Sequence, residues 1–518
     1  MSARRPVRGA ALCAALLLPT LAHAGRPDSG GDLHNFGLTD VVESLDSPSG
    51  RVRVHYSVQG PNVTLMADAD GNGLPDMPEL VASTADDVLD AYAAGGFRAP
   101  LAESAVGLGP LGGSDAFDFY LVDFAGGADG LFSNDACRHG LCAGHMLVEN
   151  DFAGYGYASI ESAVRVLASH EMFHAVQAAY RDELPVWLSE GTAEWAEDFF
   201  QPGIQDFQNF ANSYLTDSDR PIDRPPVGPI PSFAYGTCLF WKYLTLRLGD
   251  DFLPTLLEHA ATEDGLDAVE AAIAARDTTL RDLWVDFTAE NLNTGPRYND
   301  AALYPFARHL NGLSAQDRGP AIHADHRFYP LAAAYWALVH PGGPAFFGTP
   351  DVATDLVVSL HALNDTGHLT DTVTTFEPVQ GEVRALGELP AGTYWLRGTY
   401  PIRASQSRKI EFCLGGADAM TPCGLSGTPD AAVAADAAVA AEDAAVPDAD
   451  IDAAGPETDA AVADAAPWDG STEIDGATSE SGKSGGGCAV GHASARTPAL
   501  LALPLLLLLR RRRGQNRQ

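Results

Sequence analysis

Two histidines one helical turn apart mark the part of the sequence whose side chains could do chemistry. His170 and His174 flank Glu171 in the string His-Glu-Met-Phe-His, within a stretch from Ser159 to Tyr180 that contains neither proline nor glycine. On a helix, this spacing places both imidazoles on one face, where they can bind zinc, and it sets Glu171 beside the metal to take a proton from bound water. The pattern therefore predicts a zinc site that hydrolyses its substrate.

A hydrolytic zinc site also needs a third protein ligand. The run from Leu184 to Trp195 reads Leu-Pro-Val-Trp-Leu-Ser-Glu-Gly-Thr-Ala-Glu-Trp, and its proline suits the first turn of a second helix. Glu190 and Glu194 would then lie on one face of that helix, and the residues alone leave the two exchangeable. We expect Glu190 to be the ligand, because it lies nearer the helix start, where Gly191 would let the histidine helix approach.

The two motifs together resemble the gluzincin metallopeptidases, in which the second helix carries an E-G-x-A-x-x-x-E-like pattern. This resemblance covers about residues 150–195. It implies a zincin-like domain in which Glu190 binds zinc and Glu194 hydrogen-bonds His170.

An oxyanion donor is the remaining requirement for peptide hydrolysis. Tyr235, in the string Phe-Ala-Tyr-Gly at the head of the next apolar helix, resembles the tyrosine that some gluzincins use for this purpose. His139 and His145 compete for the role, and packing in the core is the alternative for Tyr235.

The order of elements over most of residues 50–423 resembles a family of secreted myxobacterial metalloproteases. The elements are a strand, a D-x-D-x-N-G-x-P-D loop, the histidine helix, the glutamate helix and a late β-rich region. This resemblance implies zinc-dependent hydrolysis of protein or peptide substrates. The alternative is a surface adhesion or binding protein that keeps the same scaffold without turnover, although a structural zinc site has no use for a base at Glu171.

An acidic loop at residues 68–79 has the spacing of a calcium site. Side-chain oxygens stand at loop positions 1, 3, 5, 9 and 12, a glycine stands at position 6, and a backbone carbonyl is available at position 7. The entering segment, residues 63–65, has the pattern of a strand, which favours a single structural ion over a regulatory pair of sites. An Asx- and glycine-rich turn without metal is the alternative. The expected calcium ligands are Asp68, Asp70, Asn72, Leu74, Asp76 and Glu79.

Both ends of the chain have the composition of targeting segments. Residues 1–24 combine three arginines, an apolar run and Ala-His-Ala before Gly25, which predicts a signal peptide. Residues 488–518 begin with Cys488 after three glycines, continue with a leucine-rich run that would form a short transmembrane helix, and finish with arginines. This order resembles the MYXO-CTERM sorting tail, and a plain membrane anchor is the alternative. We expect an exported protein, on the cell surface or released, that meets the membrane only through this tail.

The cysteines fit an oxidising compartment. Two local pairs, Cys137 with Cys142 and Cys413 with Cys423, are the expected disulfides, and Cys238 stays alone in an apolar helical context. Zinc bound by cysteines is unsupported, because the chain has no pair of C-x-x-C motifs.

Charge and periodicity divide the 518 residues into regions. A formal charge of −37 makes nucleic acid a poor partner. We expect an α+β fold made of a catalytic domain at 25–315 and a β-sandwich at 316–423, in a monomer. Residues 424–487 carry 14 acidic side chains and one lysine among alanines, which predicts a disordered linker. Helices are expected at 79–94, 158–181, 186–200 and 234–248, and strands at 51–58, 117–122, 145–148, 354–360, 372–376 and 392–397.

Overall fold

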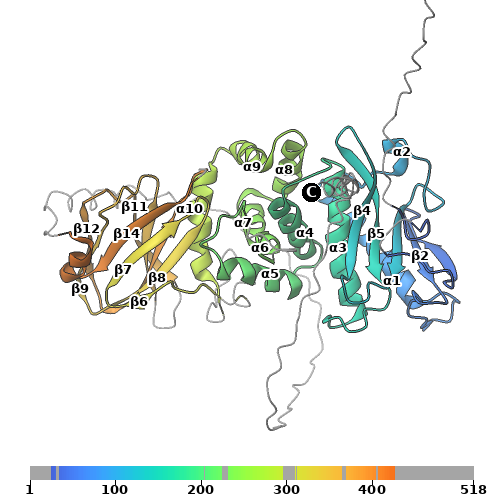
Figure 1. Ribbon diagram of the computed structural model, residues 1–518, viewed down its shortest axis with the longest axis horizontal. Helices are drawn as coiled ribbons and strands as arrows, with labels where there is room; N and C mark the ends of the chain where they lie inside the picture. Colours follow the sequence, from blue (N-terminus) through green and yellow to red (C-terminus); the bar gives the residue numbers. More distant parts are fainter. Residues whose placement is uncertain are drawn as a thin grey trace, which may run out of the picture.

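The computed structural model describes residues 25–30, 34–203, 205–224, 232–295, 310, 312–363, 369–403 and 406–425. Figure 1 shows three blocks along the long axis of the molecule: a sheet with long helices against it, a group of helices, and a region of β-strands. The expected signal peptide, the acidic linker and the tail with Cys488 lie outside the described residues.

The first block is built on a mixed sheet in the order β1-β2-β3-β5-β4. Its three inner strands run parallel, and β1 and β4 are antiparallel edge strands. The strand bounds are β1 Val42–Asp46, β2 Val52–Ser57, β3 Phe117–Val122, β4 Gly130–Arg138 and β5 Leu141–Glu149.

Alternating side chains give the sheet two buried faces. Val54, Met146 and Val148 face the large core shared with α1 (Asp76–Ala94) and α3 (Ile160–Ala178). Tyr120 and Leu147 pack in a smaller cluster instead, on the side where the short helix α2 (Glu103–Val106) and the N-terminal residues lie.

The helical block follows α3 and shares its core. Its members are α4 (Val186–Phe200), α5 (Gln205–Thr216), α6 (Ser232–Gly236), α7 (Cys238–Leu248), α8 (Phe252–Ala260), α9 (Gly265–Ala274), α10 (Leu280–Glu290) and the 3-10 turn η1 (Asn291–Asn293).

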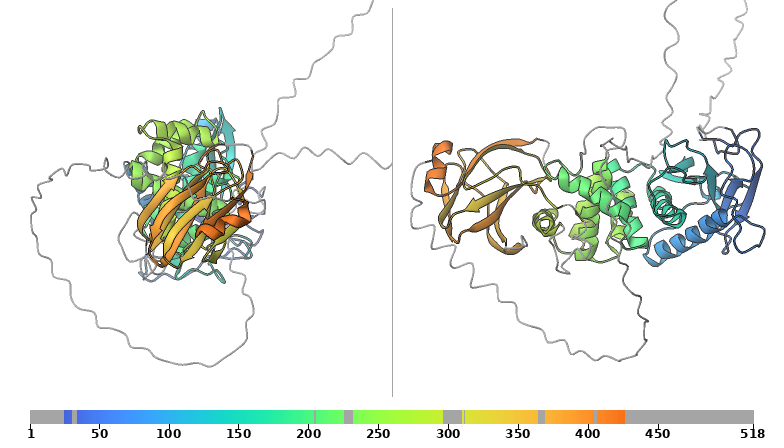
Figure 2. Two further views of the ribbon diagram at one scale, coloured as in Figure 1. Left: turned by 90° about the vertical axis from the view of Figure 1, so that its left-hand side faces the viewer. Right: turned by 90° about the horizontal axis from the view of Figure 1, so that it is seen from below.

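The last block contains two sheets, in the orders β11-β10-β13-β8-β6 and β12-β9-β14-β7. One hydrophobic cluster contains residues of both sheets, such as Trp336 of β8 and Phe412 of β14. In the right-hand view of Figure 2, these strands lie at the opposite end of the molecule from the first sheet, with the helices between them. Their bounds, with the terminal 3-10 helix, are β6 Arg318–Gly319, β7 Ile322–Phe328, β8 Ala333–His340, β9 Gly343–Gly348, β10 Val357–Leu363, β11 Leu369–Phe376, β12 Val383–Leu389, β13 Gly392–Thr399, β14 Arg408–Gly415 and η3 Ala417–Cys423.

Helix α10 packs directly on the strand region. Trp284 Nε1 donates to Thr399 Oγ1 at 3.0 Å, and the Tyr335 hydroxyl donates to the carbonyl of Thr288 at 2.6 Å. Arg397, which is 1% exposed, donates to Thr288 Oγ1 at 3.1 Å. The helical and strand blocks therefore share buried hydrogen bonds.

The expected α+β class is confirmed, and several expected elements lie where they were predicted. The helix at 186–200 and the strand at 117–122 have the expected bounds. The segment before the acidic loop differs: residues 63–65 form no strand, and Val63 makes only an isolated bridge to Ser57.

Both expected disulfides are present. Cys137–Cys142 closes the β4–β5 hairpin, and Cys413–Cys423 joins β14 to η3. Cys238 is a buried free thiol. Within the described ranges, none of the helices has the length and apolar character that a membrane span requires, and the leucine-rich run of the tail lies outside those ranges.

Candidate metal centre

Helix α3 carries the two histidines and begins with a reciprocal cap. The Ser159 hydroxyl accepts a hydrogen bond from the Ser162 amide, and the Ser162 hydroxyl accepts one from the Ser159 amide. The helix then continues without proline or glycine through His170, Glu171 and His174, which are 0%, 0% and 3% exposed. Three ionisable side chains are thus buried on one helix.

Helix α4 brings Glu190 to these histidines. Glu190 Oε2 lies 3.6 Å from His170 Nε2 and 3.6 Å from His174 Nε2. These separations exceed hydrogen-bonding distance, and all three atoms are buried without a hydrogen-bond partner. Buried polar atoms that converge in this way are costly unless a cation binds between them.

The donor set and its spacing fit zinc. Zinc–ligand distances of about 2.0–2.2 Å in a tetrahedral site place ligand atoms about 3.4 Å apart. The two separations of 3.6 Å to Glu190 are close to that value, and the three ligand atoms lie within 4.8 Å of one another. Two imidazoles and a carboxylate are also ligands that zinc accepts in catalytic sites.

The carboxylate that hydrogen-bonds His170 is Glu197, in place of the expected Glu194. Glu197 Oε1 lies 2.7 Å from His170 Nδ1, whereas Glu194 Oε2 lies 3.7 Å away. Residues 190, 194 and 197 share a helix face, because steps of three and four residues both return to the same side. The nitrogen Nδ1 can donate its proton to Glu197, which leaves the Nε2 lone pair for a metal.

Glu194 has a different environment from its neighbour. It is 0% exposed, and neither of its carboxylate oxygens has a hydrogen-bond partner. Burial, with the negative charges of Glu197 and Asp206, raises the pKa of Glu194 well above its usual range. Burial also raises the pKa of Glu197, but the hydrogen bond from His170 opposes that rise. The surroundings of Glu194 therefore disfavour its ionised form.

His174 is oriented by the side-chain amide of Gln177, which was not predicted from the sequence. Gln177 Oε1 lies 2.9 Å from His174 Nδ1, and Gln177 Nε2 donates to the Ser189 carbonyl and to Thr192 Oγ1. The Ser189 hydroxyl donates to the same Gln177 oxygen at 2.9 Å. The signal in the sequence is the spacing of three residues between His174 and Gln177, which puts both on one face of α3.

Opposing effects set the protonation of the ligands. Burial would raise the pKa of Glu190, but His174 and His170 outweigh burial and lower it to about 2. Burial would lower the pKa of His170, but Glu190 and Glu197 outweigh it and raise the pKa well above the usual range. Glu190 is therefore ionised, as a metal ligand must be, and a metal would displace a proton from His170.

Glu171 lies against the edge strand β4. Its Oε2 accepts a hydrogen bond of 2.8 Å from the Phe132 amide, and its Oε1 is buried without a partner. A Cβ atom at Gly130 would lie 3.3 Å from Glu171 Cγ, so the glycine permits this close approach. Burial raises the pKa of Glu171, which makes this carboxylate a stronger base than an exposed one.

The three candidates for an oxyanion donor lie in different places. Tyr235 is 2% exposed, and its ring stacks on His170 with a centroid separation of 5.7 Å. His139 is exposed in the β4–β5 turn. His145 is hydrogen-bonded to Asp135 and contacts the ring of Tyr120, on the sheet face away from α3. Of the three, Tyr235 is the one whose ring lies against a zinc-ligand candidate.

Gly191 allows a close helix approach, but to another helix than expected. A Cβ atom there would lie 2.0 Å from Thr237 Oγ1 and 2.7 Å from Trp241 Nε1. The missing side chain thus makes room for the start of α7 and not for α3. The Thr237 hydroxyl uses this space to donate to the Trp187 carbonyl at 2.8 Å.

The acidic loop is organised by its own backbone amides. Asp68 accepts hydrogen bonds from Gly71 and Gly73, at 2.8 and 3.0 Å, and Asp76 accepts from Ala69. Gly73, the glycine at the sixth position, has φ 90°, so the turn favours a glycine there. The helix α1 begins at Asp76, three residues before the expected start. The hydrogen bonds place the candidate calcium ligands around one loop, and they also satisfy the turn without an ion.

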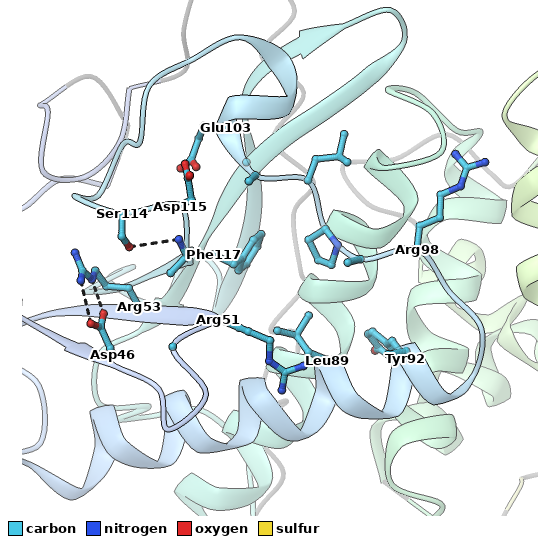
Figure 3. A pocket seen from close by; sticks show the side chains of 18 of the residues that line it. Asp46, Arg51, Arg53, Leu89, Tyr92, Arg98, Glu103, Ser114, Asp115 and Phe117 are labelled. Atoms are coloured by element: carbon cyan, nitrogen blue, oxygen red, sulfur yellow. Dashed lines mark hydrogen bonds and ion pairs between the residues drawn. The ribbon is translucent and has the colours of Figure 1, made fainter.

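A cavity of about 570 Å³ lies elsewhere, between α1 and the sheet. Figure 3 shows Tyr92, Leu89 and Phe117 at its wall, with Arg51 and Arg98 extending from different segments. No metal-ligand candidate lines it. The Tyr92 hydroxyl donates to the carbonyl of Ser169 at 2.5 Å, so the cavity wall is joined to α3 beside His170.

Comparisons with known proteins give no match, either to a protein-family model or to a curated protein. What the centre can do therefore has to follow from its own side chains.

Proposed function

We propose that this protein is an exported zinc-dependent endopeptidase. The observation that carries the proposal is the convergence of His170 Nε2, His174 Nε2 and Glu190 Oε2, which are buried and without partners, beside the unpartnered Oε1 of Glu171. Three ligands with a neighbouring base are the protein groups that a hydrolytic zinc site needs.

The arrangement of elements supports a zincin-like catalytic domain. A mixed sheet lies on the histidine helix, its antiparallel edge strand β4 contacts Glu171, and the next helix supplies Glu190. The two sheets with one common hydrophobic cluster support a β-sandwich as the second domain.

Each side chain then has a chemical task. A zinc ion at the three ligands supplies a Lewis acid and lowers the pKa of a water that it binds. Glu171 Oε1 takes the proton of the attacking water and passes it to the leaving amine, while Oε2 stays fixed by the Phe132 amide. Tyr235 donates a hydrogen bond to the oxyanion.

The compartment follows from the disulfides and the ends of the chain. Two disulfides are stable in an oxidising environment, which supports export by the signal peptide. We place the mature protein on the cell surface or outside the cell, as a monomer acting on proteins or peptides. The loop at 68–79 holds a calcium ion in the same proposal, supported by the amide-organised carboxylate of Asp68.

The test is a change at Glu171 that leaves the ligands in place. Glu171→Gln should keep about one zinc per chain and lose hydrolysis of a mixed peptide library by more than about 100-fold, because it removes the base. The matched control is Glu161→Gln on the same helix, an exposed carboxylate that pairs with Arg165. Turnover of Glu171→Gln within about tenfold of the unaltered protein would contradict the assigned role.

A second candidate is a binding protein that uses the zinc site only as structure. Burial favours this second candidate, since no side chain of the centre is more than 4% exposed: His170, Glu171, His174 and Glu190. In that case both the unaltered protein and Glu171→Gln would bind zinc, and neither would cleave the library. The same measurement thus separates the two functions.

A further inference from the structure

Arg26 is a buried arginine at the start of the described chain, away from the metal centre. It is 4% exposed, and its guanidinium ion-pairs with three carboxylates from three elements. Glu103 belongs to α2, Asp118 to β3 and Asp135 to β4, and each is 3% exposed or less. A buried cation with several carboxylates is strongly held, because removing it would leave negative charges without compensation.

The two hydrogen bonds between Arg26 and Asp135 fix the orientation of both side chains, in addition to pairing their charges. Nε of Arg26 donates to Asp135 Oδ1 at 2.9 Å, and Nη2 donates to Oδ2 at 2.5 Å. Such a bidentate pair holds both planar groups in one relative position. His145 adds a contact of 3.1 Å to the same carboxylate. The pKa of Asp135 is lowered despite its burial, because Arg26 and His145 stabilise the ionised form.

Asp135 occupies a special place in β4. Asn134 pairs with Gly144 and Ala136 with Ala143, so Asp135 is an extra residue at a β-bulge. A bulge bends the strand and sets the direction of the residues beside it. Three residues earlier on the strand, the Phe132 amide makes the 2.8 Å hydrogen bond to Glu171.

We infer that Arg26 is a positioning residue, which fixes the bulge at Asp135 and thereby holds the Phe132 amide of β4 against Glu171. The inference rests on the proposed function for its effect on turnover, but its structural part stands alone. It has a consequence for processing. Because the folded domain must retain Arg26, N-terminal cleavage must occur at or before Gly25. Residues 26–46, which include β1, are then not a removable propeptide.

The main test is Arg26→Lys in the full exported chain. Lysine keeps the positive charge that the three carboxylates require, but it has no bidentate fork. We expect unchanged zinc content and at least about tenfold faster hydrogen exchange at the Phe132 amide. We also expect kcat to fall about 10- to 100-fold while KM stays within about twofold, because substrate binding is untouched.

Two further variants complete the design. Asp135→Asn removes the carboxylate that pairs with Arg26. Like Arg26→Lys, it should speed hydrogen exchange at the Phe132 amide and lower kcat. Arg403→Lys is the matched control, because Arg403 also joins two carboxylates, Asp267 and Glu270, but does so on the surface and away from β4. It should leave exchange at Phe132 and kcat unchanged.

Several results would overturn the inference. One is Phe132 exchange and kcat within about twofold of the unaltered protein in Arg26→Lys. Another is export of both variants as unfolded chains, which would make Arg26 a requirement of the fold alone. A third is an exported native chain with full zinc content whose mass places its N-terminus after Arg26. If the unaltered protein cleaves no peptide, the proposed function fails, while the exchange and mass measurements still decide the role of Arg26.

Discussion

Two neighbouring carboxylates on α4, Glu194 and Glu197, should differ in how much zinc affinity is lost when each is changed to glutamine. Glu197→Gln removes a charged acceptor that lies 2.7 Å from His170 Nδ1 in a buried site. A hydrogen bond to a charged group contributes about 1.5–3 kcal/mol, which corresponds to about 10- to 150-fold in an equilibrium constant. Because the glutamine oxygen can still accept the hydrogen bond from Nδ1–H, we expect the lower end, about a tenfold loss of zinc affinity.

Glu194→Gln should leave the zinc affinity within about twofold. Glu194 lies 3.7 Å from His170 and makes no hydrogen bond to it. Its pKa is raised well above the usual range by burial and by the charges of Glu197 and Asp206, so its surroundings favour the neutral acid. Glutamine has nearly the same shape as that neutral acid and changes little.

The assay is a competition titration of zinc against a chromophoric chelator at one pH, with circular dichroism to show that each variant is folded. We expect the unaltered protein and Glu194→Gln to bind zinc with similar affinity, and Glu197→Gln to bind it more weakly. A Glu194→Gln variant that binds zinc as weakly as Glu197→Gln, or more weakly, would refute the assignment of the 2.7 Å contact as the one that orients His170.

The remaining predictions concern the third ligand, the acidic loop and a buried histidine. Glu190→Ala should be isolated without zinc, because it deletes one of three ligands; zinc retained at the level of the unaltered protein in an elemental analysis would exclude Glu190 from the site. Calcium at about 100 times its Kd should stabilise the protein by about 2.7 kcal/mol, and Asp70→Ala should abolish this rise in Tm; equal melting curves with and without calcium would leave only the ion-free turn. His361, buried and hydrogen-bonded to Ser359, has its pKa lowered to about 3 by burial and by Arg397. The unfolded chain therefore binds the proton first, and stability should fall as the pH drops from about 6.5 toward 3, by on the order of 4 kcal/mol in total. His361→Gln should flatten this part of a denaturant-unfolding series, and a slope unchanged from the unaltered protein would contradict the assignment.

The sequence predicted those parts of the molecule that depend on local periodicity. The helix at 186–200 and the strand at 117–122 were found with the expected bounds, because Pro185 stands before the helix and residues 119–122 form an apolar run in the strand. Strand β4 was not predicted. It contains the consecutive polar residues Ser133, Asn134 and Asp135, the last of them at a bulge, so it lacks the alternation of a half-buried strand, and its place is fixed by pairing with β5.

The candidate ligands could be selected from spacing alone, whereas their hydrogen-bond partners could not. Helical steps place Glu194 and Glu197 equally well on the face of Glu190, and only the crossing of α3 and α4 decides which one reaches His170. The same crossing brings Gln177 to Ser189 and Thr192. The partner of a side chain on another helix depends on how the two helices pack, and this packing cannot be derived from a single sequence.

The seam between α10 and strand β13 limits how the protein can be divided. Trp284 of α10 donates a hydrogen bond from its indole nitrogen to Thr399, and Arg397 of the strand donates one to Thr288 of the helix. A chain cut near residue 315, between the two expected domains, would break both hydrogen bonds and expose Trp284 on one half and Arg397 on the other. The strand region is separate in its topology but depends on α10 for its stability. A strand region that is transferred to another protein should therefore include α10.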